Sequence, residues 1–204
     1  DKAAAMDFLT VLQAHPRDRA GARVQIAKAL QTTTTSAVSL SDGDGYEDVL
    51  LRRKQDDAAP LAVWALQSDG RAFSVKRGPA GEVRRWVAIA ARTAAVEGRE
   101  LFHAGAPIEI AVTHGTTAAA MQIWTQAAGP TELAVAMKRR PARIVAFAPN
   151  RFEAGSEVSV RWADGVARLT VPEGSRVFWV DPTVETSTLP KRVTLHLQDD
   201  TGAQ

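Results

Sequence analysis

The last third of the chain shows the alternation of apolar and polar residues that is typical of a β-strand with one buried and one wet face. Residues 158–162 read VSVRW, so valine and tryptophan alternate with serine and arginine. Asp164-Gly165, a pair that favours a tight hairpin turn, separates this run from VARLTV at 166–171. Further strands are predicted at 132–137, 143–148, 176–180 and 193–198. We therefore expect an antiparallel sheet from about residue 131 onwards.

The beginning of the chain has helical spacing instead. In residues 2–14, KAAAMDFLTVLQA, apolar side chains recur at the i, i+3, i+4, i+7 positions of one helical stripe. Pro16 interrupts the pattern because proline disfavours helix at the preceding residue, and residues 17–31 then resume it. The sequence predicts a helical hairpin within residues 1–35, distinct from a domain over 36–204. Its apolar stripe would dock on the chain's own sheet or on a partner.

The middle of the chain mixes the two patterns. LAVWAL and RAFSVK flank Ser68-Asp69-Gly70, which predicts a β-hairpin over 60–77. Residues 107–112, PIEIAV, have the composition of a buried strand. A long helix is predicted over 80–101, from apolar residues three and four positions apart: Val83, Trp86, Val87, Ala90, Ala94 and Leu101. The expected fold class is α+β, with an N-terminal helical hairpin, a mixed α/β middle and an antiparallel β C-terminal third.

The stretch THGTTAAAMQIW, residues 113–124, reads as the end of a strand, a turn and the start of a helix that Gly129-Pro130 ends. The backbone N–H groups of Gly115, Thr116 and Thr117 would then lie at a helix N-terminus and could hold an anion. His114 would lie beside that anion as a candidate catalytic acid or base. The alternative is that the threonines only cap the helix, and this alternative is favoured because no nucleophile motif accompanies the histidine.

Composition limits the chemistry further. The chain has no cysteine, which excludes disulfides, thiolate catalysis and cysteine metal sites. It carries 25 basic and 23 acidic side chains, and a net charge of +2 over 204 residues argues against a dedicated nucleic-acid binder. No apolar run reaches the length of a membrane span, so no transmembrane segment is expected. The compartment stays open.

An acidic turn is the second candidate site. In SDGDGYEDVLL, residues 41–51, Asp42, Asp44 and Asp48 are spaced so that they could bind Ca²⁺ through oxygen atoms. Residues 42–70 resemble a single repeat of the FG-GAP/VCBS kind, and the resemblance implies these three aspartates as calcium ligands. The usual leading acidic position is Leu40 here, and no second copy of the repeat follows. A solvated turn without a cofactor is the alternative, because Asp and Gly favour turns in any case.

A basic segment is the third candidate site. KRRPAR, residues 138–143, offers cationic side chains that could contact phosphates, namely Lys138, Arg139, Arg140 and Arg143. No aromatic residues that would stack on bases are interleaved with them. The segment also falls where two predicted strands must be connected, and charge keeps such a loop solvated. We therefore expect a loop there rather than a nucleic-acid site.

Three functions remain from these patterns. The first is a non-enzymatic interaction or assembly protein, a structural or binding component of a larger complex with a protein partner or a second copy, because no catalytic constellation is complete. The second is a hydrolase or transferase with its site near His114. The third is a calcium-dependent binding module that uses the turn at Asp42–Asp48.

Overall fold

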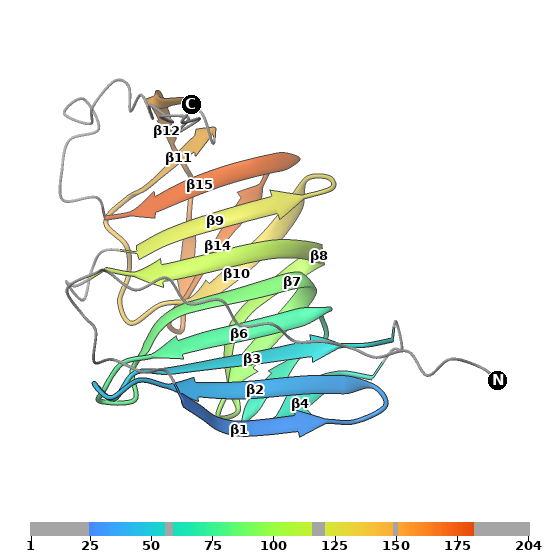
Figure 1. Cartoon of the computed structure of the whole chain (residues 1–204). Coiled ribbons are helices and arrows are strands. Elements are labelled where there is room, and N and C mark those ends of the chain that lie inside the picture. Colours follow the sequence, from blue (N-terminus) through green and yellow to red (C-terminus); the bar gives the residue numbers. More distant parts are fainter. Residues whose placement is uncertain (1–24, 56–58, 116–120, 149–150, 182–204) are drawn as a thin grey trace, which may run out of the picture.

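The computed structural model of the chain describes residues 25–55, 59–115, 121–148 and 151–181, with the backbone alone for 151–154. All of its regular elements are β-strands, and they form one antiparallel sheet (Figure 1). The predicted α+β class is therefore wrong, because the described part of the chain contains no helix and the fold is all-β. For the same residues, no helix offers the length and apolarity that crossing a bilayer requires.

The fifteen strands follow one another with short connections. They are β1 (Gln25–Gln31), β2 (Thr35–Ser41), β3 (Glu47–Arg53), β4 (Leu61–Val63), β5 (Leu66–Ser68), β6 (Ala72–Arg77), β7 (Val83–Val96), β8 (Arg99–His114), β9 (Met121–Ala127), β10 (Thr131–Ala136), β11 (Ile144–Ala148), β12 (Arg151–Glu157), β13 (Arg161–Ala163), β14 (Val166–Val171) and β15 (Gly174–Val180).

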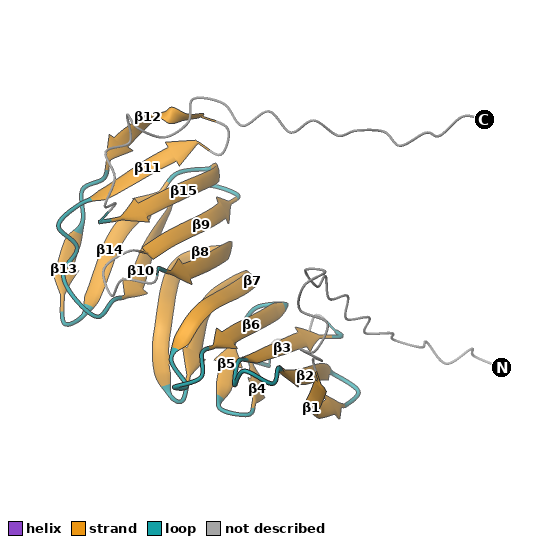
Figure 2. Cartoon of the chain, turned by 60° about the vertical axis from the view of Figure 1, so that its left-hand side comes forward, coloured by secondary structure: helices purple, strands orange, loops and turns teal. Residues whose placement is uncertain are grey.

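The sheet is folded over on itself into two layers (Figure 2). The front layer has the order β1-β2-β3-β6-β7-β8-β9-β15-β11-β12, and the back layer has the order β4-β5-β7-β8-β10-β14-β13. The long strands β7 and β8 belong to both layers. The second half of β8 pairs with β9 in front, whereas its first half pairs with β10 behind. The two layers are thus halves of one continuous sheet.

All the central strands bend at the same level, which we call the fold line. The consecutive strands β5 and β6 both pair with β7, and the consecutive strands β9 and β10 both pair with β8. In the same way, β14 pairs with β10 in the back layer and β15 pairs with β9 in the front layer. Each pair of consecutive strands (β5 and β6, β9 and β10, β14 and β15) is one long run that breaks where it passes from one layer to the other. The chain crosses the fold line at 69–71, 88–93, 105–107, 128–130 and 172–173.

Asp69 fixes the bend in β7. Its Oδ1 accepts hydrogen bonds from the backbone N–H groups of Arg92 (2.9 Å) and Thr93 (2.8 Å). The Oγ of Ser68 donates to the carbonyl of Thr93 and accepts from the N–H of Gly70. The hairpin turn predicted at 68–70 is therefore wrong, because this segment carries the chain across the fold line. The turn of that region lies between β4 and β5, where the backbone of both turn residues is left-handed.

The helix predicted over 80–101 is also wrong, since this segment contains β7 and the start of β8. The buried residues of β7 are Trp86, Ala88, Ala91, Ala94 and Val96. Along the chain these residues are two, three, three and two positions apart. The pairing register between β7 and β8 shifts within Ala88–Ala94, and each shift moves the buried face of β7 by one residue. The strand bulges thereby produce the three-residue spacing of a helix.

The other predicted elements divide between confirmed and wrong. The strand at 107–112 lies within β8, and the hairpin around Asp164-Gly165 forms between β13 and β14 with both turn residues at positive φ. The strand predicted at 158–162 is wrong in its first part, because β13 begins at Arg161 and residues 158–160 belong to no strand. Residues 25–31 of the predicted N-terminal hairpin form β1 instead of a helix. The helix predicted after residue 116 is contradicted by β9. Residues 1–24, 116–120 and 193–198 lie outside the described part of the chain.

The apolar core fills the space between the two layers. Its largest fully buried side chains come from both of them, including Leu51 and Phe73 from the front layer and Leu66, Phe102 and Leu133 from the back layer. Burial of this apolar surface is the dominant force that holds the folded sheet closed. Because the strands run across the fold line, their far ends meet on the opposite side of the core.

Candidate functional site

A pocket of about 650 Å³ opens between the two layers, on the side opposite the fold line. We call it the mouth pocket. Its front wall comes from the start of β7, the end of β8, the start of β9 and the end of β15. Its back wall comes from the β7–β8 turn and from the residues at and after the end of β10. The pocket is thus assembled from strand ends that lie far apart in the sequence.

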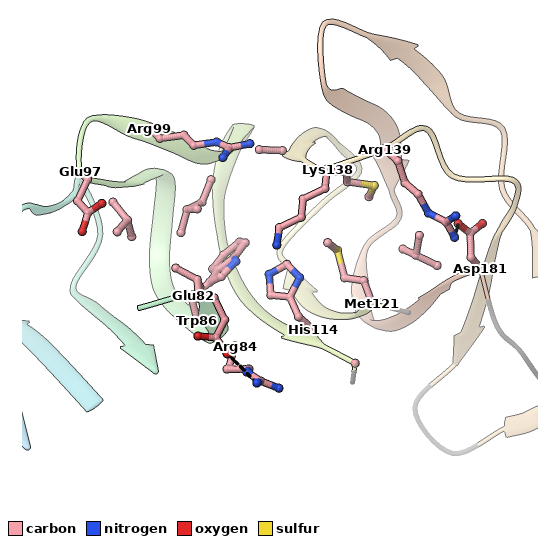
Figure 3. A pocket seen from close by; sticks show the side chains of 17 residues that line it. Glu82, Arg84, Trp86, Glu97, Arg99, His114, Met121, Lys138, Arg139 and Asp181 are labelled. Carbon is pink, nitrogen blue, oxygen red and sulfur yellow. Dashed lines mark hydrogen bonds and ion pairs between the residues drawn. The ribbon is translucent and has the colours of Figure 1, made fainter. Parts of the chain in front are cut away.

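The inner part of the mouth pocket is apolar. Trp86, Met137 and Val180 line it and are almost fully buried, while Leu101 and Met121 are half-buried and pack against the core. Figure 3 shows the ring of Trp86 beside the imidazole of His114 and the side chain of Met121 reaching into the pocket. A ligand entering here would meet hydrocarbon, aromatic and thioether surface at depth.

Carboxylates and arginines form pairs around the rim. The shortest distances are 2.6 Å for Glu82 with Arg84, 3.2 Å for Glu97 with Arg77, and 3.2 Å for Asp181 with Arg139. Every carboxylate that lines the mouth pocket therefore has a cationic partner. Backbone and side-chain hydrogen bonds together with Arg84 lower the pKa of Glu82, so this carboxyl group stays ionised at neutral pH.

Two of these ion pairs join the layers. Arg77 at the end of β6 in front reaches Glu97 in the β7–β8 turn behind. On the other side of the pocket, Arg139 behind reaches Asp181 in front, whose other oxygen accepts the backbone N–H groups of Ala142 and Arg143. The two cross-layer pairs flank the pocket and connect its front wall to its back wall.

Two cationic side chains of the mouth pocket have no ion-pair partner among the described residues. Within the residues that the structure describes, Arg99 and Lys138 line the pocket and form neither an ion pair nor a side-chain hydrogen bond. Both come from the back layer, and in Figure 3 the amino group of Lys138 points towards His114 on the front layer. The paired charges cancel, so the pocket carries the positive potential of Arg99 and Lys138.

His114 is the last residue of β8 and pairs with Met121 of β9. Burial, with a smaller contribution from the charge of Lys138, lowers the pKa of this imidazole. The ring is therefore neutral at pH 7. No described carboxylate forms a hydrogen bond that would orient it. Gly115 lines the pocket, whereas Thr116 and Thr117, which completed the predicted anion site, lie outside the described residues.

The aspartates of the acidic turn have local partners. Asp42 caps the β2–β3 turn, with its Oδ1 accepting the N–H groups of Asp44 (3.0 Å) and Tyr46 (2.9 Å). Asp48 lies on β3 and pairs with Lys76 at 3.3 Å. Among the described side chains, no group of three or more His, Asp or Glu residues is placed to hold a metal ion. The calcium site and the FG-GAP/VCBS resemblance stay predictions.

The basic segment splits into separate roles. It lies between β10 and β11, where a loop was predicted, and its side chains lie in different surroundings. Lys138 faces the mouth pocket, Arg139 pairs with Asp181, and Arg140 and Arg143 are exposed. The loop is held in place chiefly by Asp181, which binds both its backbone and its arginine.

Sequence reasoning found His114, Gly115 and Lys138 but assigned them to unrelated sites. It missed Arg99 and Met121, which lay inside segments predicted as helices. No local signal marks them, because the pocket forms only when the sheet folds over. The chain matches no protein-family model and no curated protein.

Proposed function

We propose that this protein is a non-enzymatic binding module whose ligand occupies the mouth pocket. The observation that carries the proposal is an open pocket of about 650 Å³ with an apolar interior and, at its rim, two cations that form no ion pair with any described residue. This volume and this combination of an apolar lining with a few polar groups are typical of small-molecule sites. The cross-layer ion pairs support the same view, since they connect the two walls of the pocket in the absence of a ligand.

Binding is favoured over catalysis by the surroundings of His114. A neutral imidazole can act as a general base, but an efficient one is oriented by a second group and lies within reach of a nucleophile. In Figure 3 the amino group of Lys138, the ring of Trp86 and the thioether of Met121 lie around the imidazole of His114, and no described carboxylate forms a hydrogen bond with it. None of these supplies either role, so the hydrolase or transferase hypothesis has less support than binding.

A neutral fluorescent probe tests the proposal. N-phenyl-1-naphthylamine should bind the folded protein with one-to-one stoichiometry, and its fluorescence should rise as it leaves water. Met121→Trp, which places a larger ring in the pocket, should weaken this binding about tenfold, because the apolar surface is no longer open to the probe. Met121→Leu, which nearly conserves volume, is the matched control and should bind within about twofold of the wild type.

Equal binding by all three proteins would contradict the proposal, since the probe would then lie elsewhere. The same preparations distinguish catalysis. Turnover of an ester or phosphoester substrate that disappears in His114→Ala, with an unchanged melting temperature, would replace binding by the enzymatic hypothesis.

A second candidate function is assembly through β1, and the exposed edge of that strand favours it. Among described strands, β1 pairs with β2 alone, and all seven of its residues are exposed. Ile26 is 67% exposed and Leu30 is 38% exposed. The edge strands β4 and β13 have three residues each, and β12 has seven residues but three charges in its sequence, whereas β1 has seven residues and carries Lys28 as its single charge. Such an edge can pair with a strand of a second copy or of another protein.

Light scattering after size exclusion tests this assembly. We expect the wild-type protein to show a mass above that of one chain at high concentration, and Ile26→Asp with Leu30→Asp to return it to the monomer mass. Ile89→Asp is the matched control, because Ile89 is equally large and 39% exposed but lies on β7 within the sheet. A monomer at every concentration, or dissociation caused equally by Ile89→Asp, would exclude β1 as the contact.

A further inference from the structure

The charges of the mouth pocket indicate what kind of ligand it takes. Glu82, Glu97 and Asp181 each pair with an arginine, so no free carboxylate remains among the described lining residues. Arg99 and Lys138 then remain, both on the back wall, as two donors that have no acceptor within the described part of the chain. A pocket that has cationic donors and no competing anion favours a ligand that brings its own negative charge.

The front wall does not compensate these cations. His114 faces Lys138 across the pocket, and its lowered pKa keeps the ring neutral, so it adds no charge of either sign and offers at most one nitrogen acceptor. The remaining polar groups near the rim are Arg84 and Arg139, which are already engaged with carboxylates. The positive potential therefore stays at the entrance, where Lys138 and Arg99 lie on one side.

The apolar lining of the mouth pocket sets a second requirement for the ligand, which must carry an apolar body. Trp86 and Val180 line the pocket but are almost fully buried by the core, so the open apolar lining comes mainly from the half-buried Leu101 and Met121. Met121 and Met137 add flexible thioether chains that adapt to an irregular apolar body. A highly hydroxylated ligand such as a sugar would lose its hydrogen bonds to water here and gain few in return.

We propose that the ligand is an amphipathic carboxylic acid, with its carboxylate at Lys138 and Arg99 and its aliphatic or aromatic body between the two layers. This inference rests on the proposed function, because it assigns the chemistry of the same pocket. The carboxylate would form charge-assisted hydrogen bonds with the ammonium and guanidinium groups. The body would cover the apolar surface that the half-buried Leu101 and Met121 present.

Competition between two matched ligands tests the charge requirement. Decanoate and 1-decanol have the same number of carbon atoms in an unbranched chain and differ in the group at C1. Each is titrated against the wild-type protein loaded with N-phenyl-1-naphthylamine. Decanoate should displace the probe at about tenfold lower concentration than 1-decanol. Lys138→Gln with Arg99→Gln should remove this preference and leave displacement by 1-decanol within about twofold of the wild type.

Arg168→Gln combined with Arg161→Gln is the matched control. It removes the same net charge from the back layer, at exposed positions of β13 and β14 that do not line the pocket. The control should keep the full preference for decanoate. A preference that falls equally in both double variants would reduce the effect to net charge and overturn the assignment of Lys138 and Arg99.

The two proposals fail in different ways. If 1-decanol and decanoate displace the probe equally well from the wild-type protein, and Met121→Trp still blocks the probe, the pocket binds ligands but the acid is not its class. If the probe itself binds without regard to Met121→Trp, the pocket is not the binding site and the proposed function falls together with this inference.

Discussion

Gly70→Ala should destabilise the protein by about 2–3 kcal/mol, the upper part of the range for overpacking. A Cβ atom at this position would lie 2.6 Å from the Cβ of Ala91 and 2.6 Å from the carbonyl oxygen of Ile89. Both atoms belong to the bulged section of β7 at the fold line, which Asp69 holds through two backbone hydrogen bonds. The backbone of β7 would have to move away, and that movement would strain the bend that the two layers share.

Gly129→Ala is the matched control for this substitution. Gly129 also lies at the fold line, between β9 and β10, but a Cβ atom added there would meet no atom of the described residues within 4 Å. Its φ is not in the left-handed region either. We expect the free energy of unfolding of this variant to stay within about 0.5 kcal/mol of the wild type. The free energy of unfolding of each variant is measured by urea denaturation, with far-UV circular dichroism as the signal. Equal stability of the two variants would show that β7 is not constrained at the bend.

The sequence predicted the strands best where alternation is uninterrupted. In the C-terminal third, residues 166–171 bury every second side chain, and the Asp164-Gly165 turn forms at the positions that the pair favours. These features are local, because a period of two and a two-residue turn depend only on neighbouring residues. The antiparallel sheet predicted from residue 131 is confirmed for the same reason.

The helices failed for a physical reason that β7 illustrates. Its bulges give Ala88, Ala91 and Ala94 a spacing of three, and three-residue spacing is the signal by which a helix is recognised. Alanine and arginine, both good helix formers, reinforced the error. What overrode these local preferences is the pairing of β7 with β6 and β8, which single-sequence reasoning cannot see.

The candidate site could be predicted only in pieces. His114 and Lys138 were each noticed as chemically able residues, yet they are 24 positions apart and come to face each other because β8 and β10 lie in opposite layers at the mouth. Arg99 is distinguished from the other arginines of the pocket only by its lack of an ion pair with a described residue, which is known once the partners of the rim carboxylates are known. Two of these pairs, Arg77 with Glu97 and Arg139 with Asp181, form across the layers.

Trp86→Ala should lower the free energy of unfolding by about 3–5 kcal/mol, as expected when a large buried aromatic side chain is removed. Trp86 is 2% exposed, and its ring stacks on that of Phe102 with centroids 5.3 Å apart and planes 13° from parallel. Trp86 lies in the front-layer half of β7 and Phe102 in the back-layer half of β8. The stacked pair therefore joins the two layers directly beneath the mouth pocket.

A double-mutant cycle isolates the contact between the rings. Trp86→Leu and Phe102→Leu should each destabilise the protein, and the double variant should be more stable than their sum predicts by about 0.5–1.5 kcal/mol, the coupling of an aromatic pair. Trp162→Ala on the short edge strand β13 is the control, because this ring is half-buried and should cost less than Trp86→Ala. If Trp86→Ala costs no more than Trp162→Ala, or the two leucine variants are additive, the stacked pair does not hold the layers together. In that case the rest of the apolar core and the cross-layer ion pairs would set the separation of the layers at the mouth pocket.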